Sequence, residues 1–199
     1  MKRFMIIPMI AAISFASCNN EGSQTTTTID STPDNGADIR GAGTSTTDTV
    51  NSAGSTDEAS SDFLKKAAEG GMVEVEAGKT AREKGLDGSV KNFADMMVND
   101  HTGANGEVKN LASKKNVTLP TDLPAEKKES AGKLSQKTGK DFDKAYMDMM
   151  VKDHKATIDL FEKAQKDSKD DEVRSFITTT LPKLKTHLDS AQAISKRLK

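Results

Sequence analysis

Two stretches of nine residues almost repeat each other, and each ends in Asp-His. They are FADMMVNDH, from Phe93 to His101, and YMDMMVKDH, from Tyr146 to His154, with six of the nine residues identical. The sequence has three histidines, so two of them lie in this repeated context. Imidazole nitrogens and carboxylate oxygens bind transition metals and also take part in acid–base chemistry, which makes the repeat the first candidate for a site.

The repeat also places a methionine four residues before each histidine, Met97 before His101 and Met150 before His154. Residues four apart lie on the same face of a helix. A thioether next to an imidazole suits copper(I). The alternative is that both methionines only fill the core, because methionine adapts well to irregular gaps.

The elements that must position these residues are helices, because apolar residues recur three and four apart and strand-like alternation is absent outside the N-terminal leader. We expect capping-box starts at Thr138 with Asp141 and at Ser168 with Asp171, and Pro124 in the first turn of a short helix. The sequence therefore predicts four long helices, 61–84, 87–115, 138–166 and 168–199, and a short helix, 125–136, in the middle connection.

Four long helices with two short connections and one long connection are typical of a ferritin-like bundle. The predicted fold class is all-α, a ferritin-like four-helix bundle with a short extra helix in the middle connection. An up-down-up-down bundle is the alternative topology.

Every histidine lies on the apolar face of its predicted helix: His101 on the second long helix, His154 on the third and His187 on the fourth. In the first long helix Glu74 takes a position where the spacing expects an apolar residue. A buried carboxylate requires a partner. At a rise of about 1.5 Å per residue, all four residues fall in the middle half of their helices, so they can meet.

One carboxylate and three imidazoles between four helices form a donor set for a divalent transition metal or for copper. Asp100 and Asp153, each next to a histidine of the repeat, are candidates for extra ligands or for groups that orient the imidazoles. None of the histidines has a Glu three residues before it, which argues against a standard di-iron centre.

Other roles remain open for the same residues. Buried His, Asp and Glu can hydrogen-bond to one another across a bundle and fix its register without a metal. An acid–base role is a further alternative, but the sequence has no legible nucleophile–base–orienter set and no cofactor loop, so an enzyme is the least favoured class.

Pro182 lies inside the last helix, five residues before His187. A proline at this position removes the helix hydrogen bond to Thr178 and is expected to kink the helix. Thr178, Thr179 and Thr180 are candidates to cover the freed carbonyls. The bend either wraps the helix around the bundle or aims His187 at a ligand.

The N-terminus has the pattern of a secretory signal: Lys2 and Arg3, then an apolar run that ends in Phe-Ala-Ser before Cys18, the only cysteine. Small residues before this cysteine resemble a bacterial lipobox, which predicts a signal peptide at 1–17 and a lipid on Cys18. An ordinary signal peptide with an unmodified cysteine is the alternative. Asn19 favours the outer membrane, so we expect a lipid-anchored protein of the bacterial cell envelope.

Residues 18–60 are rich in Ser, Thr, Gly, Asp and Asn, and predict a flexible, disordered tether because they hold too little apolar surface to fold. The remaining residues, 61–199, are the size of one domain. Because positive and negative side chains alternate along this domain, no basic face forms, and a nucleic-acid partner is excluded.

Five ordered motifs resemble a known bacterial envelope family, that of the domain of unknown function 4142. They are DFLKKAAEGGMVEVEAGKTA, VKNFADMMVNDH, NVTLPTDLP, FDKAYMDMMVKDHKATIDLFEKA and TLPKLKTHLDSAQ, and together they span about 61–195. The resemblance implies a ferritin-like bundle behind a signal peptide, with polar positions at Glu74, Asp100-His101, Asp153-His154 and His187. It implies no activity.

The sequence therefore supports two hypotheses from different classes. In the first, a lipid-anchored bundle binds a transition metal through Glu74, His101, His154 and His187, for metal storage or stress defence. In the second, these residues only specify the fold of a structural or partner-binding envelope protein.

Overall fold

The computed structural model describes residues 56–199, so the predicted signal peptide, the predicted lipid on Cys18 and nearly all of the predicted tether lie outside the described residues. Within 56–199 the chain forms five helices and no strand, which confirms the all-α class. The helices are α1 (Glu58–Lys84), α2 (Gly88–Lys114), α3 (Ala125–Ser135), α4 (Gly139–Asp167) and α5 (Asp171–Arg197). Across this range, we find no helix with the length and apolarity that crossing a membrane requires.

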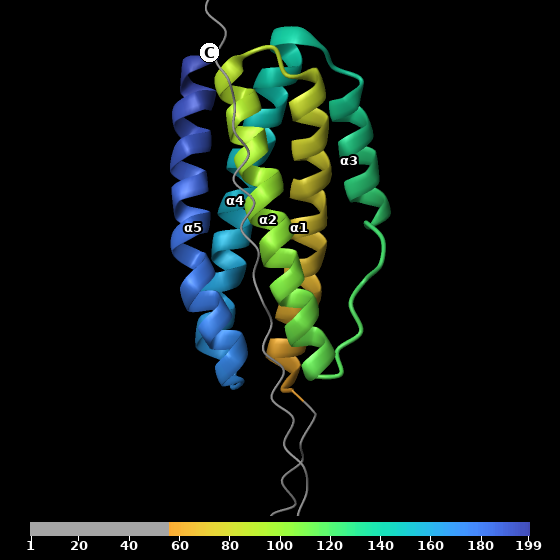
Figure 1. Cartoon of the computed structure of the whole chain (residues 1–199), viewed down its shortest axis with the longest axis vertical. Helices are drawn as coiled ribbons and strands as arrows, with labels where there is room; N and C mark the ends of the chain where they lie inside the picture. The colour runs from red at the N-terminus through yellow and green to blue at the C-terminus, as the bar shows by residue number, and fades with distance from the viewer. Residues whose placement is uncertain (1–55) are drawn as a thin grey trace, which may run out of the picture. The chain divides into compact units, whose positions relative to one another are not determined.

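The four long helices lie side by side as a bundle, and the short α3 lies outside it against α1 and α4 (Figure 1). The end of α2 meets the start of α5, where Lys115 Nζ is 2.8 Å from Asp170 Oδ2. At the other end of the bundle, Arg197 of α5 pairs with Asp87, the N-cap of α2, at 3.0 Å. Helices α2 and α5 are therefore antiparallel, and α2 and α4 run in the same direction. The long connection between these two is the predicted crossover, so the ferritin-like topology is confirmed and the up-down-up-down alternative is wrong.

Aspartates cap three of the long helices. Asp57, Asp87 and Asp170 each accept a backbone N–H from the first turn of α1, α2 and α5. Helix α1 consequently begins at Glu58, three residues before the predicted start. The predicted capping box of Ser168 with Asp171 is wrong: Ser168 is the C-cap of α4, and its buried hydroxyl lies 2.6 Å from that of Ser60.

The starts of the other two helices also differ in detail from the sequence prediction. Thr138 is the N-cap of α4, but its side chain makes no capping hydrogen bond. The next residue, Gly139, has φ +58, a conformation that favours glycine. Pro124 is the N-cap of α3 rather than a residue of its first turn, and its carbonyl accepts the N–H of Lys128.

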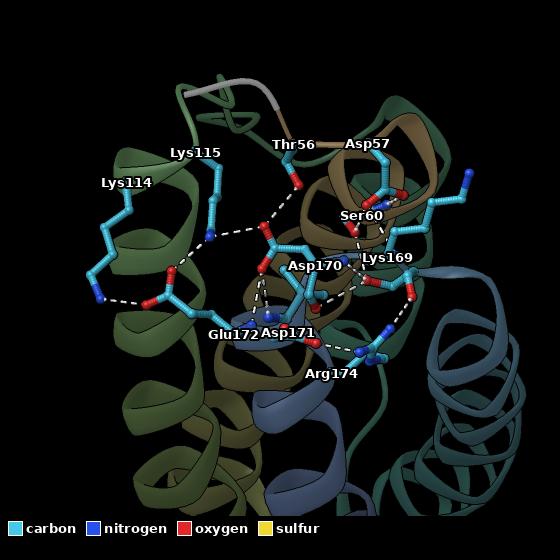
Figure 2. Close-up of polar contacts among 12 residues, drawn as sticks. Thr56, Asp57, Ser60, Lys114, Lys115, Lys169, Asp170, Asp171, Glu172 and Arg174 are labelled. Atoms are coloured by element: carbon cyan, nitrogen blue, oxygen red, sulfur yellow. Dashed lines mark hydrogen bonds and ion pairs between the residues drawn. The ribbon is translucent and has the colours of Figure 1, made fainter. Parts of the chain in front are cut away.

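A polar network joins the start of α1, the end of α2 and the start of α5 (Figure 2). Asp57 accepts the backbone N–H groups of Ser60 and Lys169, both at 3.1 Å. Lys115 lies between Asp170 and Glu172, at 2.8 and 2.6 Å. These contacts fix the first turn of α1 to the α4–α5 connection at the point where the described chain begins.

The apolar core consists of two clusters separated by one polar layer. The first contains Phe63 of α1, Val108 of α2, Phe161 of α4 and Ile177 of α5, with their neighbours. The second is formed by the opposite half of the same four helices, and includes Phe93, Met97, Tyr146, Met150 and Ala191. In each long helix, one polar residue lies between the segments that build the two clusters: Glu74, His101, His154 and His187.

Helices α1 and α2 approach each other closely where α1 has a glycine. A Cβ on Gly78 would lie 2.8 Å from Val98 Cγ2 and 3.4 Å from the carbonyl oxygen of Ala94. The turn after α1 is held by Asp143 of α4, a buried residue that the sequence analysis missed. Its carboxylate accepts the backbone N–H groups of Leu86 and Asp87, at 3.0 and 2.7 Å. Together these contacts fix the position of α1, which carries Glu74.

Pro182 lies inside α5, as predicted, and the helix continues through it. The threonine hydroxyls before it were expected to hydrogen-bond to the carbonyl of Thr178, which the proline leaves without its helix partner. The hydroxyls of Thr178 and Thr179 donate instead to the carbonyls of Arg174 and Ser175, at 2.9 and 3.2 Å, one turn earlier.

Candidate metal centre

The four polar residues predicted from the helix faces meet in the middle of the bundle. Each long helix contributes one of them, and all four are at least 95% buried: Glu74 is 2% exposed, His101 5%, His154 0% and His187 4%. The structure therefore brings together all four residues of the predicted donor set. We call His101, His154 and His187 the histidine cluster, and Glu74 is the carboxylate beside it.

Each histidine has one ring nitrogen next to an oxygen acceptor. His101 Nδ1 is 2.9 Å from Glu74 Oε2, and His187 Nε2 is 2.9 Å from Asp100 Oδ2. His154 Nδ1 is 3.0 Å from the carbonyl oxygen of Met150, one turn earlier in α4. A neutral imidazole has one N–H donor, and a carboxylate or carbonyl oxygen can only accept. These contacts therefore place the N–H of each ring on the nitrogen that faces the oxygen.

The second nitrogen of each ring then carries a lone pair, and none of the three has a hydrogen-bond partner within residues 56–199. They are His101 Nε2, His154 Nε2 and His187 Nδ1, and each is buried. Glu74 Oε1 is also buried without a hydrogen bond, 3.4 Å from His154 Nδ1. Most buried polar atoms in proteins are paired, so four such atoms in one layer require an explanation.

The three rings form a nearly equilateral triangle. Their centres are 5.6 Å apart for His101 and His154, 5.5 Å for His101 and His187, and 5.6 Å for His154 and His187. One ligand nitrogen from each ring lies within 4.8 Å of the other two. The centre of such a triangle is about 3.2 Å from each ring centre, so an ion there would be about 2.0–2.1 Å from a ring nitrogen that is turned toward it.

The charges in this layer also suit a cation. Burial lowers the pKa of His154, and the charge of Glu74 only partly offsets this effect. Burial likewise lowers the pKa of His187 more than its bond to Asp100 raises it, so both rings are neutral, the form that binds metals. Burial alone would raise the pKa of Glu74, but the proximity and hydrogen bond of His101 lower it below its ordinary value. A buried carboxylate among imidazoles gives the layer a negative charge that a metal ion would neutralise.

The two aspartates next to the repeated histidines occupy different positions. Asp100, 42% exposed, bonds to His187 of α5 rather than to its sequence neighbour His101. Asp153 lies on the other side of α4, 3.9 Å from Lys127 Nζ of α3. Burial raises the pKa of Asp153, an effect that Lys127 partly offsets. The structure thus brings Asp100 into hydrogen-bond contact with the histidine cluster and pairs Asp153 with a lysine instead.

The predicted methionines lie in the core cluster that adjoins the site. Met97 and Met150 are both fully buried there, one turn before their histidines. Tyr146, which the sequence analysis did not select, lies two turns before His154 on α4, and its buried hydroxyl has no hydrogen-bond partner in the described part of the chain. Burial and the charge of Glu74 raise the pKa of Tyr146. Its place at the start of the repeat, two helical turns before His154, was the signal in the sequence that marks this tyrosine.

A family model described as "Domain of unknown function (DUF4142)" matches residues 45–194. This match covers all four residues of the polar layer and most of the chain. Among curated proteins, none matches the chain at a significant level.

Two kinds of solved structure are similar to the bundle. A DUF305 fragment from Deinococcus radiodurans has a TM-score of 0.65 and 9% sequence identity, over 72% of this chain and 99% of that one. CopM in its Cu(I)-bound form has a TM-score of 0.60 and 11% identity, over 69% of this chain and 96% of that one. The silver-bound form has a TM-score of 0.57 and 13% identity, with the same coverage. At these identities the likeness establishes the helical-bundle fold.

Proposed function

Because this chain belongs to the DUF4142 family, whose description assigns no activity, we propose its function from the polar layer: the domain binds one transition-metal ion between its four long helices. His101, His154 and His187 are the nitrogen ligands, and Glu74 is the neighbouring carboxylate. The bundle holds the ion in a buried site, which suits storage or sequestration of the metal.

One observation carries this proposal. Each histidine has one ring nitrogen that faces an oxygen acceptor and a second, buried nitrogen without a partner in the described residues, and the three rings offer ligand atoms within 4.8 Å of one another. Metal-binding histidines typically have this arrangement, because the outer hydrogen bond fixes the tautomer and the orientation of the ring. A buried polar atom without a partner costs about 1–3 kcal/mol, so three lone pairs and one carboxylate oxygen would be costly in a network that served the fold alone.

Copper(I) and zinc(II) are the metals that this donor set favours. Imidazole suits both, and Glu74 would add a fourth ligand of the kind that zinc accepts. Met97 and Met150 favour copper(I), because both thioethers lie one turn from a cluster histidine. The likeness of the bundle to CopM in its copper- and silver-bound forms supports the same choice.

We infer the cellular location of the protein from its N-terminal sequence. We propose that residues 1–17 direct export, that Cys18 carries the lipid, and that the following residues tether the bundle to the bacterial outer membrane. A site in the cell envelope would meet metal ions before they reach the cytoplasm. Stress defence against an excess of metal is the physiological role that fits this position.

The alternative function is structural, and one observation favours it: the hydrogen bonds of His101 with Glu74 and of His187 with Asp100 join α2 to α1 and to α5. Such pairs can fix the register of a bundle. They leave the three buried, unpartnered nitrogens unexplained, which is why metal binding is the main proposal.

The metal content of the purified domain separates these two functions. Protein prepared without chelators is loaded with Cu+ or Zn2+, passed through a desalting column and analysed for metal. We expect about one ion per wild-type chain, and much less than one for His101→Ala, since this change removes one of three nitrogen ligands. Lys155→Ala, an exposed change on α4, is the control and retains the wild-type content. A wild-type domain that retains neither metal would favour the structural function.

A further inference from the structure

A cavity of about 140 Å³ between α2 and α5 reaches the histidine cluster from the surface. Its inner wall contains His101 and His187, and its outer part contains Asp100, Gly103, Glu107 and Lys183. A cavity needs about 10–15 Å³ to hold one water molecule, so this one has room for several. We call it the access cavity. His101 and His187, each with one buried nitrogen that has no hydrogen-bond partner in the described residues, therefore line the inner end of a space that solvent can fill.

The composition of the access cavity suits a hydrated cation. Asp100 and Glu107 contribute two carboxylates, and Lys183 contributes one ammonium group, so negative charge exceeds positive charge. Asp100 is 42% exposed and also bonds to His187 Nε2, which means that one side chain contacts both solvent and a cluster histidine. Carboxylates that line a cleft raise the local concentration of cations.

A second cavity next to the polar layer is less suitable. It has a volume of about 40 Å³ and touches Glu74 and His101. Apolar side chains, including Leu160, Phe161 and Phe176, line much of it. Its lining also contains Lys66, and Glu74 is its only carboxylate, so it attracts a cation less than the access cavity does.

The α2 wall of the access cavity owes its width to a glycine. Gly103 lines the cavity, and a Cβ built on it would meet no atom within 4 Å. Asp100, Gly103 and Glu107 are three and four residues apart, so they lie on one face of α2. A larger side chain at residue 103 would project into open space in front of the histidine cluster.

We propose that the access cavity is the route by which the metal ion reaches the histidine cluster, with Asp100 as its positioning residue. This inference rests on the proposed function. Asp100 attracts the hydrated ion at the mouth of the cavity. It also accepts the N–H of His187 Nε2, which leaves the lone pair of His187 on Nδ1, the buried nitrogen that would bind the ion. The route opens between α2 and α5, where Asp100 and Glu107 line its outer part.

Gly103→Leu tests the route without changing a ligand. The rate of metal uptake is measured by stopped flow as Zn2+ or Cu+ passes from a chromogenic chelator to the metal-free protein, and affinity is measured by equilibrium competition with the same chelator. We expect uptake and release to slow by about tenfold or more, equivalent to about 1.4 kcal/mol or more in the barrier, with unchanged affinity. Leucine is a better helix former than glycine, so α2 is retained.

Gly106→Leu is the matched control, because it makes the same change on α2 at a position that also has no atom within 4 Å but does not line the access cavity. Its uptake rate is expected to equal that of the wild type. If Gly103→Leu takes up metal as fast as Gly106→Leu, the proposed route is wrong. If the wild-type protein binds neither Zn2+ nor Cu+, the proposed function fails instead.

Asp100→Asn tests the positioning role. We expect it to lower metal affinity by about 10–100-fold, the usual effect of removing a group that orients a metal-binding histidine. It should also slow uptake and weaken the dependence of the uptake rate on salt. Nitrogen NMR of the metal-free protein reads the tautomer of His187 directly. A His187 ring that keeps its proton on Nε2 in Asp100→Asn, together with wild-type affinity, would overturn the role of Asp100.

Discussion

The melting temperature of the wild-type domain is expected to rise by about 10 °C when the free metal concentration is 1,000 times the dissociation constant, and His154→Ala is expected to abolish this rise. An ion that binds only the folded protein stabilises it by about 4 kcal/mol at that ratio. His154 is fully buried in the bundle, so no side chain from solvent can replace its nitrogen as a ligand. Thermal unfolding is followed by circular dichroism, with and without Zn2+ or Cu+.

Ile158→Ala is the matched control for this prediction. Ile158 lies one turn after His154 on α4 and is also buried, but it belongs to the apolar cluster and offers no ligand atom. Its truncation is expected to cost about 2–5 kcal/mol of folding stability through the cavity that it leaves. The metal-dependent rise should nevertheless persist in this variant. A His154→Ala protein that keeps the full rise would show that the ion binds elsewhere.

Phe63→Ala is expected to lower the free energy of unfolding by about 3–5 kcal/mol. Phe63 is 1% exposed and lies edge-on to Phe161 of α4, with ring centres 4.9 Å apart, and 6.3 Å from Phe176 of α5. The ring thus joins α1 to two other helices at the end of the bundle where the described chain begins. Removal of the ring loses both its apolar burial and the aromatic pairs. Urea denaturation measures the change.

Leu86→Ala is the comparison for Phe63→Ala. Leu86 is a large apolar residue in the connection between α1 and α2, and it is 64% exposed. Its truncation should change the free energy of unfolding by no more than about 0.5 kcal/mol, as is usual at exposed positions. Equal losses in the two variants would contradict the arrangement of the core around Phe63.

The sequence was sufficient to predict the helices and the polar layer, because both follow from the helical repeat of about 3.6 residues per turn. Apolar residues three and four apart defined the buried face of each helix, and the histidines and Glu74 interrupted those faces at similar heights. The length of the connection from Lys115 to Thr138, which contains α3, indicated that α2 and α4 are parallel. No strand competed for these segments, so local pattern and tertiary packing agree.

The details that the sequence missed depend on contacts between helices. Ser168 and Asp170 are both good capping residues, and the contact of Ser168 with Ser60 of α1 leaves Asp170 as the N-cap of α5. Asp100 and Asp153 hold equivalent places in the repeat, yet one faces α5 and the other faces α3. A repeat of nine residues predicts which residues lie on the buried face of a helix, but it does not predict which other helices pack against that helix. It therefore could not distinguish these two aspartates.

The central claim is that one metal ion lies between His101, His154 and His187. Crystals grown with Zn2+ or Cu+, with diffraction recorded on both sides of the absorption edge of that metal, test this claim most directly. We expect one anomalous peak per chain in the triangle of the three rings, close to Glu74. A map with no peak there, or with peaks only at surface carboxylates, would contradict it.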